Sequence, residues 1–335
     1  MNTVAVIIPN YNGKKYIADC LNSLKKQTFK DFCVIIVDNA STDGSPDQVE
    51  KDFADSFPEV RIIRLSENTG FANAVNVGIR YAMGQEDIAE SGSAKYVFLL
   101  NNDTRCHEKA IEALVKAMDS NPGAFSVQAK MLQFKDTDRV DDAGDYYCAL
   151  GWAFSPARDQ KSSKFDKRIK VTSACGGAAM YRVEAFAETG LFDDVHFCYL
   201  EDVDIGYRAR LMGYQNLMEP KAVVYHAGSG SSGSRYNAFK VELTASNNLY
   251  LIYKNMPILQ VLINLPLVIT GILIKHIFYM KRGLGGAHIK GLTLGFSKIF
   301  KNSDRKVRFG GRQILNCIRM QLELWINCLR LGRFL

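Results

Sequence analysis

Four groups of side chains that can bind cations or move protons follow apolar segments of this sequence. Carboxylate oxygens are the usual ligands of Mg²⁺ and Mn²⁺, and an added imidazole nitrogen shifts the preference toward Mn²⁺. An aspartate within reach of a hydroxyl can act as a general base. A single acid after a strand is most often a cap or a surface residue, so only the convergence of several groups predicts a site. The groups are Asp38, Asn101 to Asp103, Glu201 to Asp204, and His226.

The apolar segments before the first two groups have the length and composition of buried strands, and helical patterns separate them. This order predicts a parallel, doubly wound α/β sheet, in which ligands bind at the carboxyl ends of the strands. Asp38 and Asp103 are both expected at that edge. The predicted strands are Val4 to Ile8, Cys33 to Val37, Val60 to Leu65 and Tyr96 to Leu100, and the predicted helices include 16–24 and 71–83.

The secondary-structure pattern is weaker between Gln128 and Val171. Within it, the polar stretch from Ser155 to Lys170 predicts a long mobile loop. Gly176-Gly177 then permits close approach of a ligand or another backbone. A short strand over Ala222 to Tyr225 and a Gly/Ser-rich turn over Gly228 to Ser234 are expected further on.

Five ordered motifs resemble those of glycosyltransferase family 2, which has the GT-A fold. The likeness covers about residues 3 to 230 and is greatest to bacterial rhamnosyltransferase-type members. It implies a doubly wound, Rossmann-like mixed sheet in a catalytic domain of residues 1–253, with a nucleotide-binding half to about 105 and an acceptor half over 106–253. The motifs are VIIPNYN (6–12), VDNASTDGS (37–45), NTGFANAVNVG (68–78), LLNNDT (99–104) and EDVDIGYR (201–208).

The resemblance assigns the donor, a sugar linked to dTDP or UDP, to the first half of the chain. Pro9 and Tyr11 would line the base pocket, with Tyr11 stacked on the base; the alternative for Tyr11 is a packed surface aromatic. Asp38 would accept a hydrogen bond from the imide N–H of the base. Asn68 and Gly70 would approach the donor from the next loop, where a glycine allows close backbone contact.

The resemblance also implies a divalent metal, Mg²⁺ or Mn²⁺, that neutralises the diphosphate leaving group. Asn101-Asn102-Asp103 occupies the place of the family's D-x-D motif, so Asp103 would be a ligand and Asn102 would contact the donor. His226 matches a position where some members use a further ligand, and imidazole favours Mn²⁺. The alternative for His226 is a hydrogen-bonded histidine beside a glycine turn.

Asp202 matches the aspartate of the family's E-D motif and would be the general base that takes the proton of the acceptor hydroxyl. Glu201 or Asp204 would hold the acceptor or cap the following helix. The implied reaction is a single displacement with inversion at the anomeric carbon. Rhamnose is favoured as the sugar by likeness alone, and the acceptor is expected to be a saccharide or a polyprenyl-linked saccharide in cell-surface polysaccharide synthesis.

The last part of the chain, residues 254–335, differs in composition from the rest. It carries 14 basic against 2 acidic residues, whereas the first 253 residues carry 28 basic against 33 acidic. Residues 255–274 hold no charge, a length that can span a bilayer. Pro257 and Pro266 are expected to interrupt this run, and a narrow polar stripe favours a helix lying in the membrane interface. The stripe comprises Gln260, Asn264, Gly271, Lys275 and Arg282.

A second amphipathic helix is predicted near the end of the chain, over residues 312–330. One face is basic and polar; the other contains Trp325 and several aliphatic residues. Together the two helices predict a peripheral protein on the inner face of the cell membrane. The alternative is that these helices pack on the catalytic domain or on a second subunit of a homo-oligomer.

Composition and short motifs limit the classes of protein to which this chain can belong. A hydrophobic content of 47% excludes a disordered chain, and eight cysteines without a C-x-x-C pair indicate a reducing compartment. The first nine residues lack the features of a secretory signal, so a cytoplasmic location is expected. A processive polysaccharide synthase would carry Q-x-x-R-W after the E-D motif, which is missing here. A noncatalytic sugar-nucleotide or membrane-binding protein stays an alternative, and nucleic acid is not an expected partner because no recognised module is present.

Overall fold

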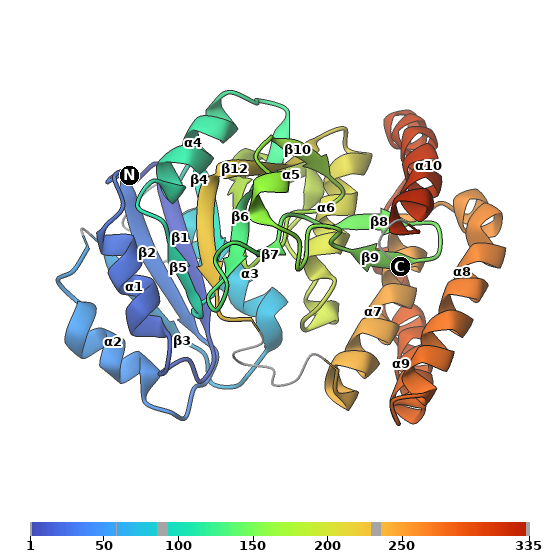
Figure 1. Cartoon of the computed structure of the whole chain (residues 1–335), viewed down its shortest axis with the longest axis horizontal. Helices are drawn as coiled ribbons and strands as arrows, with labels where there is room; N and C mark the ends of the chain where they lie inside the picture. The colour runs from blue at the N-terminus through green and yellow to red at the C-terminus, as the bar shows by residue number, and fades with distance from the viewer. Residues whose placement is uncertain (1, 58, 86–92, 229–235, 333–335) are drawn as a thin grey trace.

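The computed structural model describes residues 2–57, 59–85, 93–228 and 236–332. In these residues ten strands form one mixed sheet with the order β10-β12-β6-β11-β4-β1-β2-β3, while β5 pairs with β12 and β7 with β6. Helices cover both faces of the sheet, and four C-terminal helices stand together at one side of the molecule (Figure 1). The predicted turn over Gly228 to Ser234 lies almost wholly outside the described residues.

The first half of the sheet is parallel, as the sequence predicts. Strand β1 pairs with β2 and β4, and β2 pairs with β3. Alternate residues of β1 face opposite helical layers: Val4 and Val6 pack toward α1 and α4, and Ala5 and Ile7 toward α3. A strand buried on both faces must be apolar throughout, which explains its continuous hydrophobic run. The elements are β1 (Val4–Asn10), α1 (Ile17–Lys25), β2 (Phe32–Asp38), α2 (Ser45–Phe53), β3 (Val60–Arg64), α3 (Gly70–Ala82) and β4 (Tyr96–Leu100).

The second half makes the sheet mixed. Strand β11 is antiparallel to both β4 and β6, whereas β12 is parallel to β6. The predicted short strand before His226 is wrong at its start, because β12 begins seven residues earlier, at Gln215. Its polar residues are buried with partners: Asn216 bonds to Thr172 O and Gly206 O. The elements are β5 (Thr104–Cys106), α4 (Ala110–Asp119), β6 (Ala124–Gln133), β11 (Ala178–Arg182) and β12 (Gln215–His226).

Short elements fill the region where the sequence pattern is weak. The long loop expected over 155–170 ends earlier than predicted, because its last residues belong to an edge strand that pairs with β12, and it contains a 3₁₀ turn. The ion pair between Arg168 and Glu219 joins the same two segments. The elements are β7 (Val140–Asp142), β8 (Tyr146–Cys148), β9 (Trp152–Phe154), η1 (Ser162–Lys164), β10 (Ile169–Val171), η2 (Val183–Ala185), α5 (Phe186–Thr189), η3 (Asp194–His196) and α6 (Glu201–Leu211).

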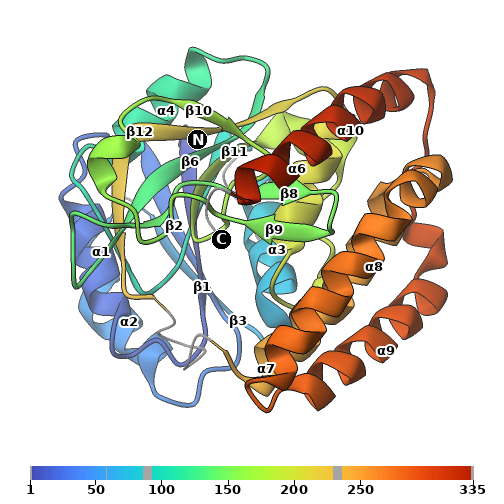
Figure 2. The same cartoon turned by 45° about the vertical axis from the view of Figure 1, so that its right-hand side comes forward.

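The C-terminal part is helical throughout its described length. Helices α7 and α9 lie side by side, and a Cβ added to Gly291 of α9 would lie 2.6 Å from the carbonyl oxygen of Glu242 in α7. Figure 2 shows α8 and α9 as neighbours, with α10 crossing near the β8–β9 hairpin. The elements are α7 (Ala238–Asn255), α8 (Ile258–Met280), α9 (Gly285–Lys301), η4 (Ser303–Arg305) and α10 (Gly311–Leu331).

Helix α8 corrects one sequence-based expectation and shows which way its polar stripe faces. Pro266 does not interrupt it: Pro257 is the N-cap, and one helix of 23 residues runs through Pro266. The polar stripe faces the protein rather than water, because Gln260, Asn264 and Gly271 are buried. Asn264 and the Gln321 side chain of α10 exchange two hydrogen bonds of 2.8 Å, which satisfies both buried amides.

Candidate active site

Asn10, at the end of strand β1, connects residues that are predicted to bind the donor. The sequence did not single out this residue. Asn10 and Asp38 are paired in the parallel register of β1 and β2. The Asn10 amide donates to Asp38 Oδ1 at 2.9 Å and to Ser45 Oγ at 2.8 Å, and its oxygen accepts from Asn102 Nδ2 at 2.9 Å. Asp38 and Asn102 are therefore parts of one buried network. In the sequence, the only sign of this role was the position of Asn10 inside the motif VIIPNYN.

Two other predicted donor residues flank this network. Tyr11 follows β1 directly and is 43% exposed, so its ring is available to a ligand. Pro9 lies in β1, half-buried, opposite Val37 in the register.

Asn68 and Gly70 connect the donor side to the loop before the E-D motif. Asn39 donates to Asn68 Oδ1 at 2.9 Å, and Asn68 Oδ1 also accepts from Gly70 N at 3.0 Å. Gly70 has a φ of +84°, and a Cβ there would lie 2.5 Å from the carbonyl oxygen of Phe197. The glycine is thus required by a backbone contact inside the protein, whatever it contributes to a donor.

Asp103 and His226 meet at the place where β5 pairs with β12. The Nε2 atom of His226 lies 3.2 Å from Asp103 Oδ1, and Nδ1 lies 2.7 Å from Asp141 Oδ2. Burial alone lowers the pKa of His226, but the two carboxylates outweigh it and raise that pKa to about 10. The ring therefore sits in a strongly negative environment. Sequence reasoning missed Asp141, which lies in the weakly patterned region.

Asp103 and His226 fit the divalent metal that the sequence motifs imply. They supply one carboxylate oxygen and one imidazole nitrogen close enough to share an ion, and that donor set suits first-row divalent cations. The neighbouring Asn102 is held by a hydrogen bond from its amide nitrogen to Asn10. Asp103 and His226 are accordingly the residues that would hold the metal.

The predicted base, Asp202, lies in the first turn of α6 and receives two backbone hydrogen bonds. Gly176 N donates to Oδ2 at 3.3 Å, and Val203 N donates to Oδ1 at 2.8 Å. Burial raises the pKa of Asp202 to about 6, with Asp142 acting in the same direction and the two N–H groups acting against it. An aspartate with that pKa can accept a proton near neutral pH.

The Gly176-Gly177 segment joins this base to the end of β4. Gly177 O accepts from Asn101 N at 2.9 Å, and the neighbouring Gly176 N holds Asp202. A Cβ on Gly177 would lie 3.2 Å from the Asn101 side chain. The structure thus places Asp202, the predicted base, near the segment that carries Asp103.

The other two acids of the E-D motif differ from Asp202. Glu201 is buried, its Oε2 has no hydrogen-bond partner among the described residues, and burial raises its pKa well above the ordinary value. Asp204 is fully buried and accepts from Arg208, Lys254 and Asn255. Asp204 is therefore engaged inside the protein, so Glu201 rather than Asp204 stays the prediction for holding the acceptor, and both acids lie in the first turn of α6, where the helix dipole favours them.

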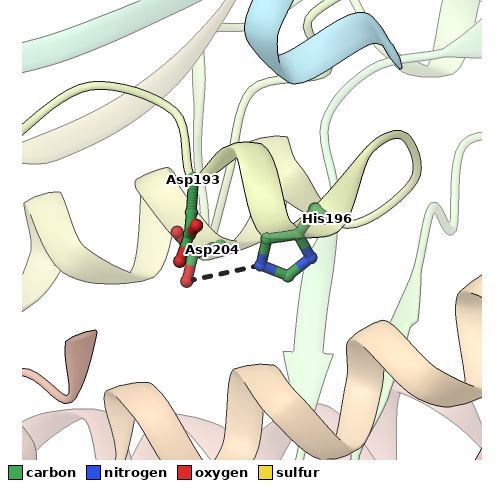
Figure 3. A group of neighbouring side chains, drawn as sticks. All are labelled: Asp193, His196 and Asp204. Atoms are coloured by element: carbon green, nitrogen blue, oxygen red, sulfur yellow. Dashed lines mark ion pairs between the residues drawn. The ribbon is translucent and has the colours of Figure 1, made fainter. Parts of the chain in front are cut away.

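Asp204 belongs to a second cluster of titratable groups, with Asp193 and His196 (Figure 3). Its carboxylates already have cationic partners: Lys254 Nζ lies 2.6 Å from Asp193 Oδ2 and 2.9 Å from Asp204 Oδ2, and Arg305 contacts Asp193. Burial acts to raise the pKa of Asp204, but Lys254 and Arg208 bring it well below the ordinary value. We interpret this cluster as an ion network that joins α6 to the C-terminal helices.

The loop that leads into α6 is strained. Phe197, Tyr199 and Leu200 have φ values of 61°, 68° and 68°, which non-glycine residues rarely adopt. The Asn247 amide of α7 donates to the carbonyls of His196, Cys198 and Tyr199 at 2.7 to 2.9 Å. Strain of this kind persists only where surrounding contacts hold it, and it concentrates at functional sites.

Comparisons with known proteins agree with this geometry. Residues 5–190 match the model of the family described as glycosyl transferase family 2. Over 248 residues, 69% of this chain and 78% of the relative, the sequence is 27% identical to N-acetylglucosaminyl-diphospho-decaprenol L-rhamnosyltransferase of Mycobacterium tuberculosis strain H37Rv.

Two solved structures share the fold. A mannosyltransferase from Pyrobaculum calidifontis in complex with GDP-Man and Mn²⁺ aligns with a TM-score of 0.54 at 18% identity, over 96% of this chain and 81% of that one. GalNAc-T7 with UDP, GalNAc and Mn²⁺ aligns with a TM-score of 0.59 at 16% identity, over 76% of this chain but 48% of that one. These likenesses show a GT-A fold, and the family match, which covers more than half of the chain, shows that this protein belongs to glycosyl transferase family 2 and is a glycosyltransferase.

Proposed function

We propose that this enzyme transfers a sugar, with inversion, from a dTDP- or UDP-linked donor to a saccharide or polyprenyl-linked saccharide in cell-surface polysaccharide synthesis. The observation that carries the proposal is Asp202: it is held by Gly176 beside the Asp103 segment, and its pKa lies near 6. Rhamnose is the proposed sugar and a lipid-linked saccharide the proposed acceptor, because the Mycobacterium tuberculosis relative carries both in its name.

In the proposed reaction, Asp202 takes the proton of the acceptor hydroxyl as its oxygen attacks the anomeric carbon, and the bond to the nucleotide diphosphate breaks. Tyr11 and Asp38 hold the nucleobase of the donor, and the hydrogen bonds of Asn10 keep Asp38 in place. A divalent ion bound by Asp103 and His226 would neutralise charge on the departing diphosphate. Attack from the opposite side in one step gives inversion.

A panel of sugar nucleotides tests this proposal. Each donor is incubated with the enzyme and Mn²⁺ or Mg²⁺, with and without a polyprenyl-diphosphate-linked N-acetylglucosamine, and release of nucleotide diphosphate is measured. We expect dTDP-rhamnose to give the greatest acceptor-dependent release. Release from no donor under any condition would favour the noncatalytic binding protein instead.

We further propose that α8, α9 and α10 attach the enzyme to the inner face of the cell membrane as a peripheral protein. The support is the outward position of their large apolar side chains: such residues are exposed on all three helices, and the buried faces of α8 and α9 consist mostly of small and polar residues. Helix α8 is also long and apolar enough to cross a membrane. We favour a helix that lies in the membrane interface over one that spans the membrane, because the polar stripe of α8 is buried against the protein along its length. The outward residues include Leu259, Leu262, Leu273, Ile289, Phe296, Phe300, Leu315, Ile318, Trp325 and Leu329.

A further inference from the structure

We infer that Asp141 is a positioning residue, which orients His226 so that its Nε2 atom faces the cation site at Asp103. The inference rests on the metal site of the proposed function. Asp141 comes from β7, 85 positions before His226 in the sequence, and its Oδ2 lies 2.7 Å from His226 Nδ1. The carboxylates of Asp103 and Asp141 thus lie against the two different nitrogens of one ring.

The fold fixes Asp141 in this place from two sides. Strand β7 pairs with β6 across a register shift between Met131 and Leu132, next to Gln133, which is the register partner of His226. Val140 and Asp142 are buried, so the alternation of a strand turns Asp141 to the opposite side. Arg158 Nε also donates to the Asp141 carbonyl oxygen at 3.1 Å, which ties down its backbone.

The hydrogen-bonding chemistry then determines which ring nitrogen can bind a metal. An ionised carboxylate only accepts hydrogen bonds, so Asp141 favours the tautomer of His226 with its proton on Nδ1, which leaves Nε2, the nitrogen that faces Asp103, for a metal. A metal-binding histidine commonly donates its second N–H to a carboxylate, and this partner fixes both the tautomer and the ring orientation. Without Asp141 the ring is free to turn about its side-chain torsions and to lose its alignment with Asp103.

Mn²⁺ binding tests this role without requiring turnover. Free Mn²⁺ is measured by electron paramagnetic resonance in titrations of the full-length protein with saturating UDP or dTDP. We expect Asp141→Ala to weaken Mn²⁺ binding by about 10- to 100-fold, the usual effect of removing such a partner. Asp141→Asn retains an acceptor oxygen and should fall between Asp141→Ala and wild type. Asp136→Asn, an exposed acid of the preceding turn, is the matched control and should bind as wild type does.

A double-mutant cycle separates positioning from direct ligation. If Asp141 acts only through His226, then Asp141→Ala should cause no further loss of Mn²⁺ affinity in a His226→Ala background. A full additional loss there would make Asp141 a ligand in its own right, and unchanged affinity in both Asp141 variants would overturn the inference. Wild-type protein that binds no Mn²⁺ would instead refute the metal site of the proposed function. Thermal unfolding of each variant verifies the fold, and Asp141→Asn serves if Asp141→Ala is unstable.

Discussion

At the scale of single residues, two aspartates separated by one position have opposite electrostatic environments. Asp204 is surrounded by Arg208 and Lys254, which hold its pKa well below the ordinary value despite burial. Asp202 is half-buried and has no cation at hydrogen-bond distance among the described residues, and desolvation, aided by Asp142, raises its pKa to about 6. Groups whose environments separate their pKa values in this way have separate roles. We therefore propose Asp202 as the base, whereas the Asp204 carboxylate is paired with cations inside the protein.

The pKa of Asp202 predicts the pH dependence of transfer. The base must be deprotonated to act, so activity is expected to rise with pH and to reach half its plateau at about pH 6. The measurement is kcat/KM for nucleotide release across a pH series. Asp142→Asn removes a charge that raises this pKa, so it should move the midpoint to lower pH. A midpoint near the ordinary aspartate value of 3.8 would contradict the assignment.

Substitution of the base itself is the second residue-scale prediction. Asp202→Asn keeps an oxygen that can accept from Gly176 N but removes proton acceptance, so transfer should fall by about 10²- to 10⁴-fold. Nucleotide binding, measured by calorimetry, should stay near the wild-type value. Asp52→Asn, an exposed acid on α2, is the control. Transfer at the wild-type rate would remove Asp202 from the mechanism and leave Glu201 as the next candidate.

At the scale of elements, the C-terminal helices take part in shaping the active site. The Asn247 amide of α7 holds the strained loop before α6, and Lys298 of α9 in turn donates to Asn247 and to Val195 O. The ion network through Lys254 and Arg305 adds a second connection to the same region. Removing these helices would expose buried polar groups and part of the core, so deletion is a poor test of their function.

Asn247→Ala tests this connection. The change leaves the Cys198 and Tyr199 carbonyls of a strained loop without this donor, and an unsatisfied buried polar group costs about 1–3 kcal/mol. We expect a lower midpoint of thermal unfolding and a lower kcat, because this loop leads directly into the helix that carries Asp202. The comparison variant is Asn316→Ala on α10, which removes one hydrogen bond to the carbonyl oxygen of Leu211 at the end of α6. It should lower stability without lowering kcat. Equal kcat in Asn247→Ala and wild type would show that the loop keeps its shape unaided.

At the scale of the whole molecule, the outward apolar faces and the positive charge occur in the same part of the chain. Residues 254–335 carry 14 basic and 2 acidic residues. Leu315 and Leu329 on α10 are 63% and 75% exposed, and Phe300 on α9 is 79% exposed. Contiguous apolar surface of this kind marks an interaction site, and adjacent basic residues favour an anionic bilayer over a neutral partner.

Sedimentation with vesicles tests attachment. The protein should pellet with anionic vesicles, and high salt should weaken this without abolishing it, because apolar burial is not screened. Leu315→Glu combined with Leu329→Glu should reduce binding strongly. Arg319→Gln should reduce it modestly, by about 1 kcal/mol, and only at low salt.

The control for sedimentation is Lys51→Glu on α2, a charge reversal at the side of the sheet away from the C-terminal helices (Figure 1). This variant should pellet as wild type does. Analytical ultracentrifugation without lipid tests the alternative that this surface binds a second copy of the protein. If the Leu315→Glu and Leu329→Glu protein pellets normally with vesicles but a wild-type dimer dissociates in this variant, the surface binds a second copy instead.

The sequence by itself determined the features that depend on local order. Buried parallel strands must be apolar throughout, so the runs that form β1, β2 and β4 could be predicted from their residues. The chemistry of a parallel sheet gathers at its carboxyl edge, which predicted the places of Asp38 and Asp103. The meeting of Asp103 with His226 agrees with the family resemblance, which assigns both residues to one metal.

Only the tertiary structure decided which partners those residues have. Asn10 and Asp141 became visible because strands far apart in the sequence bring them to Asp38 and His226. The pKa of Asp202 depends on burial and on Asp142, which no spacing along the chain reveals. Helix α8 shows the same principle: its two faces can be seen in the sequence, but the polar face packs inward because Gln321 and other residues satisfy its amides there. Burial is a property of three-dimensional neighbours, and a linear pattern gives the faces of an element without giving what each face meets.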